Sequence, residues 1–194
     1  MIATVKPLFT PSRLSARVAE LGKQISKAHG TKPLDVVAIM DNAIVFAADL
    51  MRHLRCPAVC HFVRAEIRDV ELGGYTRKEI LFSPEPYLKG RDVLLVDAVL
   101  HTGVTLEFWA RRLQASKPRS LRIAVLVNKP LERKVDLKPD YFCFESASKQ
   151  MVGYGLPGPN GQYRNLPYVG TLDGKVQSGR RAKASGSRHR KARG

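Results

Sequence analysis

An apolar run followed by a short polar loop constrains the fold of this chain more than any other segment. Residues 92–96 read Asp-Val-Leu-Leu-Val, a run too short for a helix and bounded by charge, which is typical of a strand buried on both faces of a parallel sheet. A polar loop and a segment with helical spacing of apolar residues (104–115) follow it. A strand that passes through such a loop into a helix leaves backbone N–H groups unpaired at the positive end of the helix dipole. The segment therefore predicts a seat for a phosphate group.

The loop also carries side chains that are suited to phosphate. Thr102 and Thr105 can donate hydroxyl hydrogen bonds to phosphate oxygens, and Gly103 lets the backbone approach an anion without an intervening Cβ. The alternative is structural, because Thr102 could simply cap the helix that follows while Gly103 makes the turn. Short loops that contain glycine discriminate poorly, so the loop alone leaves both interpretations open.

Strand-like and helix-like segments alternate along most of the chain. Buried strands are predicted at 34–40, 57–63 and 121–127, helices at 11–29 and 44–55, and a hairpin with a Gly-Gly turn at 65–82. The alternation predicts an α/β fold with a doubly wound parallel sheet, in which ligands bind beyond the carboxyl ends of the strands. Asp41, Asp97 and Lys129 all follow such strand ends. The pattern alone therefore predicts that they share one site.

The net charge of +16 is divided evenly between a C-terminal tail and the rest of the chain. Residues 174–194 hold eight Lys or Arg and no acid, and they offer almost nothing to bury. We therefore expect a folded domain over residues 1–173 and a disordered basic tail over 174–194. The tail is either a solvated end or a loose, salt-sensitive contact for RNA or another polyanion.

Location and metal content follow from features that the sequence lacks. No apolar run reaches membrane-spanning length and residues 1–10 do not resemble a signal peptide, so we expect a cytoplasmic protein with no membrane partner. Three cysteines without a CxxC pair fit a reducing compartment. His and Cys residues cluster over residues 53–61, but their spacing matches no familiar zinc pattern, so no metal site is predicted.

The strand, loop and helix around Asp97 resemble the phosphoribosyl-pyrophosphate loop of type I phosphoribosyltransferases. In that family the strand ends in two acids, and a short linker leads to an acid-Thr-Gly-x-Thr phosphate cradle. This chain keeps the first acid, Asp97, but has Ala98 in place of the second acid and His101 in place of a catalytic Asp. The resemblance implies that Asp97 holds a ribose hydroxyl and that His101 is a possible base. The residues that it assigns to the 5′-phosphate are Thr102, Gly103, Val104 and Thr105.

Further matches point to the hypoxanthine and guanine enzymes of that family. Lys129 matches a lysine that donates to the exocyclic oxygen of a 6-oxopurine, and Asn42 lies in the turn that meets pyrophosphate. The segment 137–170 resembles the C-terminal hood of the purine enzymes, where Met151 is implied to contact the base and Arg164 to help hold pyrophosphate. The implied fold is the type I phosphoribosyltransferase fold, with a small hood and a flexible hairpin.

Other positions depart from the family pattern. Asp41-Asn42 replaces the Lys-Gly of the pyrophosphate turn, and Ala65-Glu66 replaces the Ser-Tyr of the flexible lid. Gln150 replaces the aromatic residue that stacks on the purine, and Pro157 replaces an acid that helps to hold magnesium. A carboxylate that faces pyrophosphate repels it, and stacking is worth about 1–3 kcal/mol per base. We therefore expect weakened substrate binding.

Two functions remain open from the sequence. The first is a purine phosphoribosyltransferase that converts hypoxanthine or guanine and phosphoribosyl pyrophosphate to a nucleotide, with attenuated or lost catalysis. His101 would then exchange the purine N7 proton, Mg²⁺ would be required, and a homodimer or homotetramer is expected. The alternative is a non-catalytic regulator that binds a purine nucleotide or RNA, because the loop 97–103 also resembles that of the pyrimidine-operon RNA-binding regulators and the chain is basic.

Overall fold

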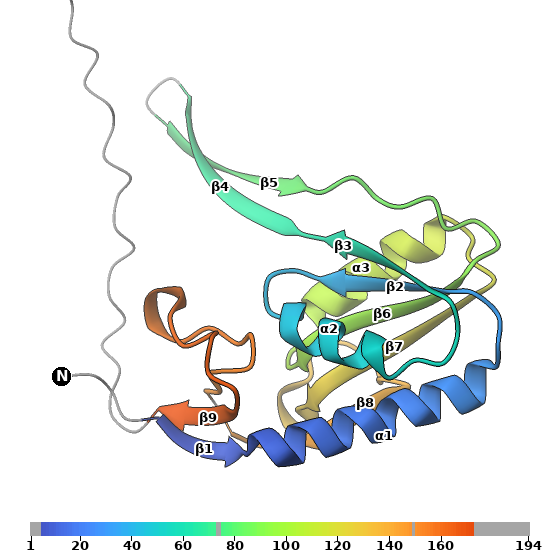
Figure 1. The fold of residues 1–194 in the computed structure, drawn as a ribbon. Coiled ribbons are helices and arrows are strands. Elements are labelled where there is room, and N and C mark those ends of the chain that lie inside the picture. The colour runs from blue at the N-terminus through green and yellow to red at the C-terminus, as the bar shows by residue number, and fades with distance from the viewer. Residues whose placement is uncertain (1–4, 73–74, 149, 173–194) are drawn as a thin grey trace, which may run out of the picture.

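Five parallel strands form the central sheet of the protein, and helices cover both of its faces (Figure 1). The computed structural model describes residues 5–72, 75–148 and 150–172. The strands, in spatial order, are β3 (Ala58–Val63), β2 (Leu34–Ile39), β6 (Asp92–Leu100), β7 (Ser120–Asn128) and β8 (Tyr141–Glu145). Helices α1 (Pro11–His29) and α2 (Ile44–Arg52) pack on one face, and α3 (Val104–Ala115) packs on the other. The predicted α/β doubly wound parallel sheet is confirmed.

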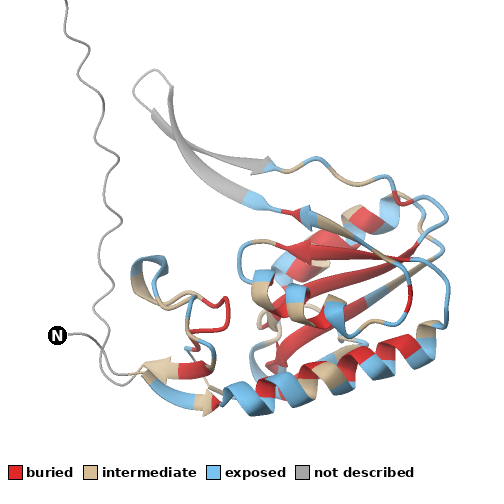
Figure 2. Cartoon of the chain, in the orientation of Figure 1, coloured by how far each residue is buried: buried red, intermediate tan, exposed pale blue. Residues whose placement is uncertain are grey.

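The core lies on both sides of β2 and β6, whose residues are nearly all buried (Figure 2). Leu94 and Val96 of β6 face the α1 and α2 side, whereas Val93 and Leu95 face α3. Apolar residues at helical spacing supply the covering layers, and the fully buried ones among them are Leu14, Leu21, Ile25, Phe46, Leu50, Leu106, Trp109 and Leu113. Because both faces of these strands are covered, their sequences read as continuous apolar runs rather than as an alternation.

Local signals define both ends of α1, as the sequence predicted. The Thr10 side chain accepts a hydrogen bond from the Arg13 backbone N–H, Pro11 begins the helix, and Gly30 ends it with a φ of +80°. The prediction for α2 was wrong at its C-terminus, because the helix ends at Arg52 and not at residue 55. There the His53 N–H bonds to the Leu50 carbonyl, three residues back, and the chain then extends toward the next strand.

The predicted hairpin is present beside the sheet. β4 (Ala65–Leu72) pairs antiparallel with β5 (Tyr75–Phe82), and the pair projects away from the sheet in Figure 1. At its base, Phe82 stacks on Phe108 of α3 with ring centroids 4.9 Å apart, and the guanidinium of Arg112 lies over both rings. The Gly-Gly turn, at residues 73–74, lies outside the described residues.

A second small sheet, which the sequence did not predict, joins the two ends of the domain. β1 (Val5–Phe9) pairs antiparallel with β9 (Val169–Leu172). β8 falls within the segment that resembled the hood, but it joins the central sheet through β7, so the C-terminal hood is confined to residues 150–172 (Figure 1). Residue 173 and the basic tail 174–194 lie outside the described residues, and none of the described helices could span a membrane.

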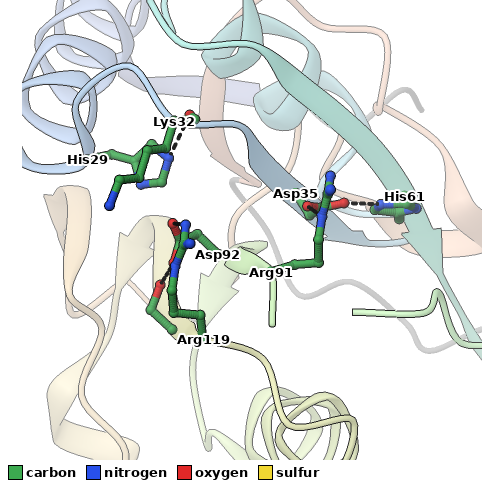
Figure 3. Close-up of polar contacts among 8 residues, drawn as sticks. His29, Lys32, Asp35, His61, Arg91, Asp92 and Arg119 are labelled. Atoms are coloured by element: carbon green, nitrogen blue, oxygen red, sulfur yellow. Dashed lines mark hydrogen bonds and ion pairs between the residues drawn. The ribbon is translucent and has the colours of Figure 1, made fainter. Parts of the chain in front are cut away.

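Two buried carboxylates lie near the amino ends of the strands, at the edge opposite the predicted site (Figure 3). Asp35 accepts hydrogen bonds from His61 Nε2 and Arg91 Nε, both at 2.8 Å. Asp92 forms a two-pronged ion pair with Arg119, whose hydrogen bonds hold the pKa of Asp92 well below its usual range. These contacts tie neighbouring strands together and serve the fold rather than the site.

Candidate functional site

The phosphate loop connects β6 to α3 in three residues. Gly103 is the N-cap of α3 and has a φ of +85°, a conformation that favours glycine. No side chain caps this helix, so the capping role that was open for Thr102 is not observed. A Cβ on Gly103 would lie 2.5 Å from Val135 Cγ2, which shows how tightly the loop is packed from behind. The first N–H groups of α3 lack intrahelical partners by geometry and so favour an anion.

A cavity of about 280 Å³ lies beyond the carboxyl ends of β2 and β6, beside this loop. Its polar lining comes from residues that the sequence singled out: Asn42, Asp97, His101, Thr102 and Thr105. Gly103 also lines it, whereas Val104 does not, and the Val104 side chain is 53% exposed. Val104 can therefore serve an anion through its backbone alone. The strand-end pattern correctly brought Asp97 and the loop together, whereas Asp41 and Lys129, which the same pattern assigned to the site, do not line this cavity.

Asp97 is more deeply buried than its sequence position suggested. β6 continues to Leu100, so Asp97 lies within the strand and not after it. Its carboxylate accepts a hydrogen bond of 2.7 Å from the Ala98 backbone N–H. Burial raises the pKa of Asp97 to about 7, and the backbone hydrogen bonds oppose this shift only partly. Near neutral pH the carboxyl is thus poised between its acid and its ionised form.

The carboxylate of Glu132, which was not predicted from the sequence, connects His101 with Lys129. Glu132 Oε2 lies 2.5 Å from His101 Nε2, and Glu132 Oε1 lies 3.8 Å from Lys129 Nζ. Lys129 is only 4% exposed, so it is not a solvent-facing turn lysine. The only sequence signal for Glu132 was an acid three residues after Lys129 with Pro130 between them. That spacing brings two side chains together in a 3₁₀ turn.

The two residues assigned to pyrophosphate contact each other, and of the two only Asn42 lines the cavity. Arg164 Nη1 donates to Asn42 Oδ1 at 2.8 Å and to the Gly155 carbonyl at 2.5 Å, although Asn42 and Arg164 are 122 positions apart. The adjoining Met40–Asp41 peptide bond is cis. The Asp41 carboxylate lies 3.5 Å from the Arg64 guanidinium, so Asp41 has a cationic neighbour that the sequence did not reveal.

Met151, the second residue assigned to the base, is placed differently. Its side chain is 8% exposed and belongs to the core cluster of buried residues on the α1 and α2 side of the sheet. It does not line the cavity. Gln150 is exposed next to it, and Pro157 is half-buried in the C-terminal hood. Lys129 and Arg164 do not line the cavity either, so the base contact assigned to Met151 stays a prediction.

Comparison with known proteins agrees with this geometry. Residues 8–157 match the family model of the phosphoribosyl transferase domain. The chain is 33% identical over 175 residues to a hypoxanthine-guanine phosphoribosyltransferase of Mycobacterium avium, covering 87% of this chain and 86% of that protein. It is 31% identical over 175 residues to the Streptococcus thermophilus (strain CNRZ 1066) protein of the same name, covering 88% and 94% respectively.

Solved structures give the same result. A crystal structure of a hypoxanthine-guanine phosphoribosyltransferase from Bacillus anthracis superposes with a TM-score of 0.77 at 30% identity, and covers 87% of this chain and 99% of that one. The hypoxanthine phosphoribosyltransferase of Trypanosoma cruzi gives a TM-score of 0.75 at 26% identity, and covers 89% and 93%. The sequence match, the superposition and the phosphate loop agree, and this chain belongs to the type I phosphoribosyltransferase family, with relatives among its hypoxanthine-guanine enzymes.

Proposed function

We propose that this protein is a purine phosphoribosyltransferase for hypoxanthine or guanine that works with reduced efficiency. The observation that carries the proposal is the single cavity in which the phosphate loop, Asp97 and His101 meet, with Lys129 held beside it through Glu132. Relatives at about 30% identity that are named hypoxanthine-guanine phosphoribosyltransferases support the same substrates. Three free cysteines fit the reducing cytoplasm in which we place the reaction.

The proposed reaction transfers the phosphoribosyl group of phosphoribosyl pyrophosphate to a purine nitrogen. Purine N9 forms a bond to C1′ of phosphoribosyl pyrophosphate, the bond from C1′ to the pyrophosphate oxygen breaks, and its electron pair leaves with pyrophosphate. The N7 proton passes to the free ring nitrogen of His101. The loop at 102–105 binds the 5′-phosphate, Asp97 accepts from a ribose hydroxyl, and Lys129 donates to the purine O6. Arg164 binds the departing pyrophosphate.

Magnesium, which the family implies, finds few ligands in this chain. The cavity offers one carboxyl, Asp97, whose pKa of about 7 leaves it partly protonated at neutral pH. Over residues 5–72, 75–148 and 150–172, no group of three His, Cys, Asp or Glu side chains is arranged to hold an ion. Mg²⁺ is usually held by one or two carboxylates and substrate phosphates. The residues present do not fit a resident magnesium ion, and we propose that Mg²⁺ enters as the counter-ion of the pyrophosphate substrate.

Reduced efficiency is proposed because of three departures from the family pattern. Ala98 is buried and supplies no second acid for the ribose. Asp41 places negative charge in the pyrophosphate turn, which the Arg64 guanidinium offsets only across an exposed ion pair. Gln150 provides no aromatic face for the purine. Each departure weakens binding of one part of the substrate pair and leaves the phosphate loop untouched.

Calorimetric titration tests the proposal, using phosphoribosyl pyrophosphate, IMP and GMP with Mg²⁺, followed by turnover assays on hypoxanthine and guanine. Lys129→Met should weaken IMP affinity by about 10–100-fold, the loss of one hydrogen bond from a charged donor. Lys23→Met, a change at an exposed position on α1, should leave it unaltered. The absence of heat with all three ligands would refute the proposal. Nucleotide binding without turnover would instead favour the non-catalytic regulator.

RNA binding by the tail is tested separately. The tail's charge of +8 predicts weak, salt-sensitive RNA retention that disappears when the chain is cut after Leu172. Retention that survives this cut would place RNA on the folded domain.

We propose that a second copy of the chain covers an apolar surface on α2 and β3. The surface is a hollow of about 440 Å³, and its side chains include Ile44, Met51, Cys60 and Phe62. Ile44 is 46% exposed and Phe62 55%, which is unusual for large apolar residues that lie side by side. The homo-oligomer that the family resemblance implies would bury them. Phe62→Glu should convert the oligomer to a monomer in light scattering, and a wild-type monomer would contradict the proposal.

A further inference from the structure

Glu132 contacts His101 and Lys129, the two side chains that bind the purine in the proposed function. One carboxylate oxygen lies 2.5 Å from His101 Nε2 and the other lies 3.8 Å from Lys129 Nζ. His101 follows β6, whereas Lys129 and Glu132 follow β7, so the contact joins two separate strand ends. Glu132 is not one of the positions that the family resemblance assigned to the site.

The backbone around Glu132 is built to hold this contact. Lys129 precedes the short 3₁₀ helix Pro130–Glu132, in which side chains three positions apart lie one above the other. The Lys129 N–H donates to the Leu100 carbonyl at 3.0 Å, and the Lys134 N–H donates to the Thr102 carbonyl at 2.9 Å. These two hydrogen bonds flank the contact between Glu132 and His101 on both sides. The contact therefore rests on main-chain pairing and not on two side chains alone.

The chemistry of a carboxylate determines which ring nitrogen of His101 remains available. An ionised carboxylate can only accept hydrogen bonds, so Nε2 must carry the hydrogen that it donates to Glu132. In the neutral imidazole, Nδ1 then has a free electron pair and can accept a proton. In serine hydrolases a carboxylate orients the histidine base by the same principle, with the roles of the two ring nitrogens exchanged.

We propose that Glu132 is a positioning residue that fixes His101 as a base through Nδ1 and holds Lys129 as a donor, so that the site selects 6-oxopurines. This inference rests on the proposed function. The edge of a 6-oxopurine presents two acceptors once the N7 proton has gone, N7 and O6, whereas a 6-aminopurine presents an amino donor in place of O6. The protonated imidazole and the lysine ammonium match the first pattern, and the lysine clashes with the second.

The test compares Glu132→Gln with Glu20→Gln, which changes an exposed glutamate that pairs with Arg17 on α1, away from the site. Two quantities are measured in the full-length protein: steady-state kinetics with hypoxanthine, and the ratio of the dissociation constants of AMP and IMP. Thermal melts confirm that both variants are folded. Glu132→Gln should lower kcat by about 10–100-fold and leave KM for phosphoribosyl pyrophosphate within about twofold, since the phosphate loop is intact. The ratio of the dissociation constant of AMP to that of IMP should fall by about tenfold.

The outcomes separate this inference from the function on which it rests. Glu20→Gln should match the wild type in every measurement. If the wild type binds IMP and Glu132→Gln has the same kcat and the same AMP-to-IMP ratio as Glu20→Gln, the positioning role is refuted and the proposed function stands. If the wild type binds nucleotide without turnover, the ratio of the AMP and IMP dissociation constants alone tests the positioning role. A ratio in Glu132→Gln that equals the ratio in Glu20→Gln then refutes it. If the wild type binds neither IMP nor phosphoribosyl pyrophosphate, both proposals fail.

Discussion

Gly103 offers the sharpest test of whether the phosphate loop is as tightly packed as the structure indicates. Replacing it with alanine has two separate costs. The first is conformational, because a φ of +85° places an L side chain in the left-handed region, at about 1–2 kcal/mol. The second is steric, because the new Cβ would lie 2.5 Å from Val135 Cγ2 and 3.1 Å from Arg133 Cδ. Overpacking of this kind costs about 1–3 kcal/mol.

A matched glycine separates these two costs. Gly161 has a φ of +77°, but a Cβ added there would meet nothing within 4 Å. Gly161→Ala should therefore cost about 1–2 kcal/mol, and Gly103→Ala about 2–5 kcal/mol. Introducing Val135→Ala should remove most of the steric part. The double-mutant cycle between positions 103 and 135 should then show a favourable coupling of about 1–3 kcal/mol.

Urea unfolding measures these free energies, and IMP titration measures the consequence for binding. Gly103→Ala should weaken IMP by at least about tenfold, since the loop must shift to accommodate the methyl group. Gly161→Ala, away from the loop, should not change the affinity. Equal destabilisation by the two alanine substitutions would refute the reasoning, as would a cycle without coupling to Val135.

Three further predictions concern buried charge, at the site and at the opposite edge of the sheet. Because the folded-state pKa of Asp97 is raised to about 7, its contribution to stability is present at acid pH and is lost as pH rises from about 4 through 7. In urea unfolding, Asp97→Asn should have the same free energy of unfolding as the wild type near pH 4. Near pH 8.5 its free energy of unfolding should be higher than that of the wild type by about 2–4 kcal/mol. The pKa of Asp92 is lowered by Arg119, so the stability that the ionised carboxylate contributes is present above about pH 4 and lost in acid. Asp92→Asn should lower the free energy of unfolding by about 1–3 kcal/mol at pH 7. This difference from the wild type should disappear as pH falls below about 4. Ala98→Asp, which restores the family's second acid, should destabilise the protein by about 3 kcal/mol or more in the same assay, because Ala98 is fully buried in the core.

Local signals in the sequence account for most of the fold that was predicted correctly. The boundaries of the hairpin and of α3 agree with the structure to the residue, because turn glycines and helical spacing are written in short stretches of sequence. β1 was missed because its five residues include Pro7 and the strand that it pairs with, β9, lies at the other end of the domain. A pairing between such distant segments leaves little trace in either segment alone. The C-terminus of α2 was wrong by three residues because packing and the following turn, not helix propensity, end it.

The same distinction explains what was predicted of the site. Asp97 and the loop were found because the carboxyl ends of neighbouring parallel strands must meet at one edge. The depth of Asp97 was missed, since a strand that continues to Leu100 was not distinguishable from one that ends at Val96. Glu132 and Arg64 were missed because each contacts a site residue more than twenty positions away. Main-chain pairing between segments creates those contacts.

Two of the departures from the family pattern have a side chain of opposite charge beside them in the structure. Where a catalytic carboxylate is replaced by His101, Glu132 restores a carboxylate beside it at 2.5 Å. Where a lysine is replaced by Asp41, the Arg64 guanidinium lies 3.5 Å away and supplies a positive charge. The first contact leaves one negative charge beside His101, whereas Asp41 and Arg64 together carry no net charge where the family's lysine carries one positive charge. Both counter-charges fit the slow enzyme that we propose, and turnover of hypoxanthine by the full-length protein distinguishes that enzyme from a protein that binds nucleotide without catalysis.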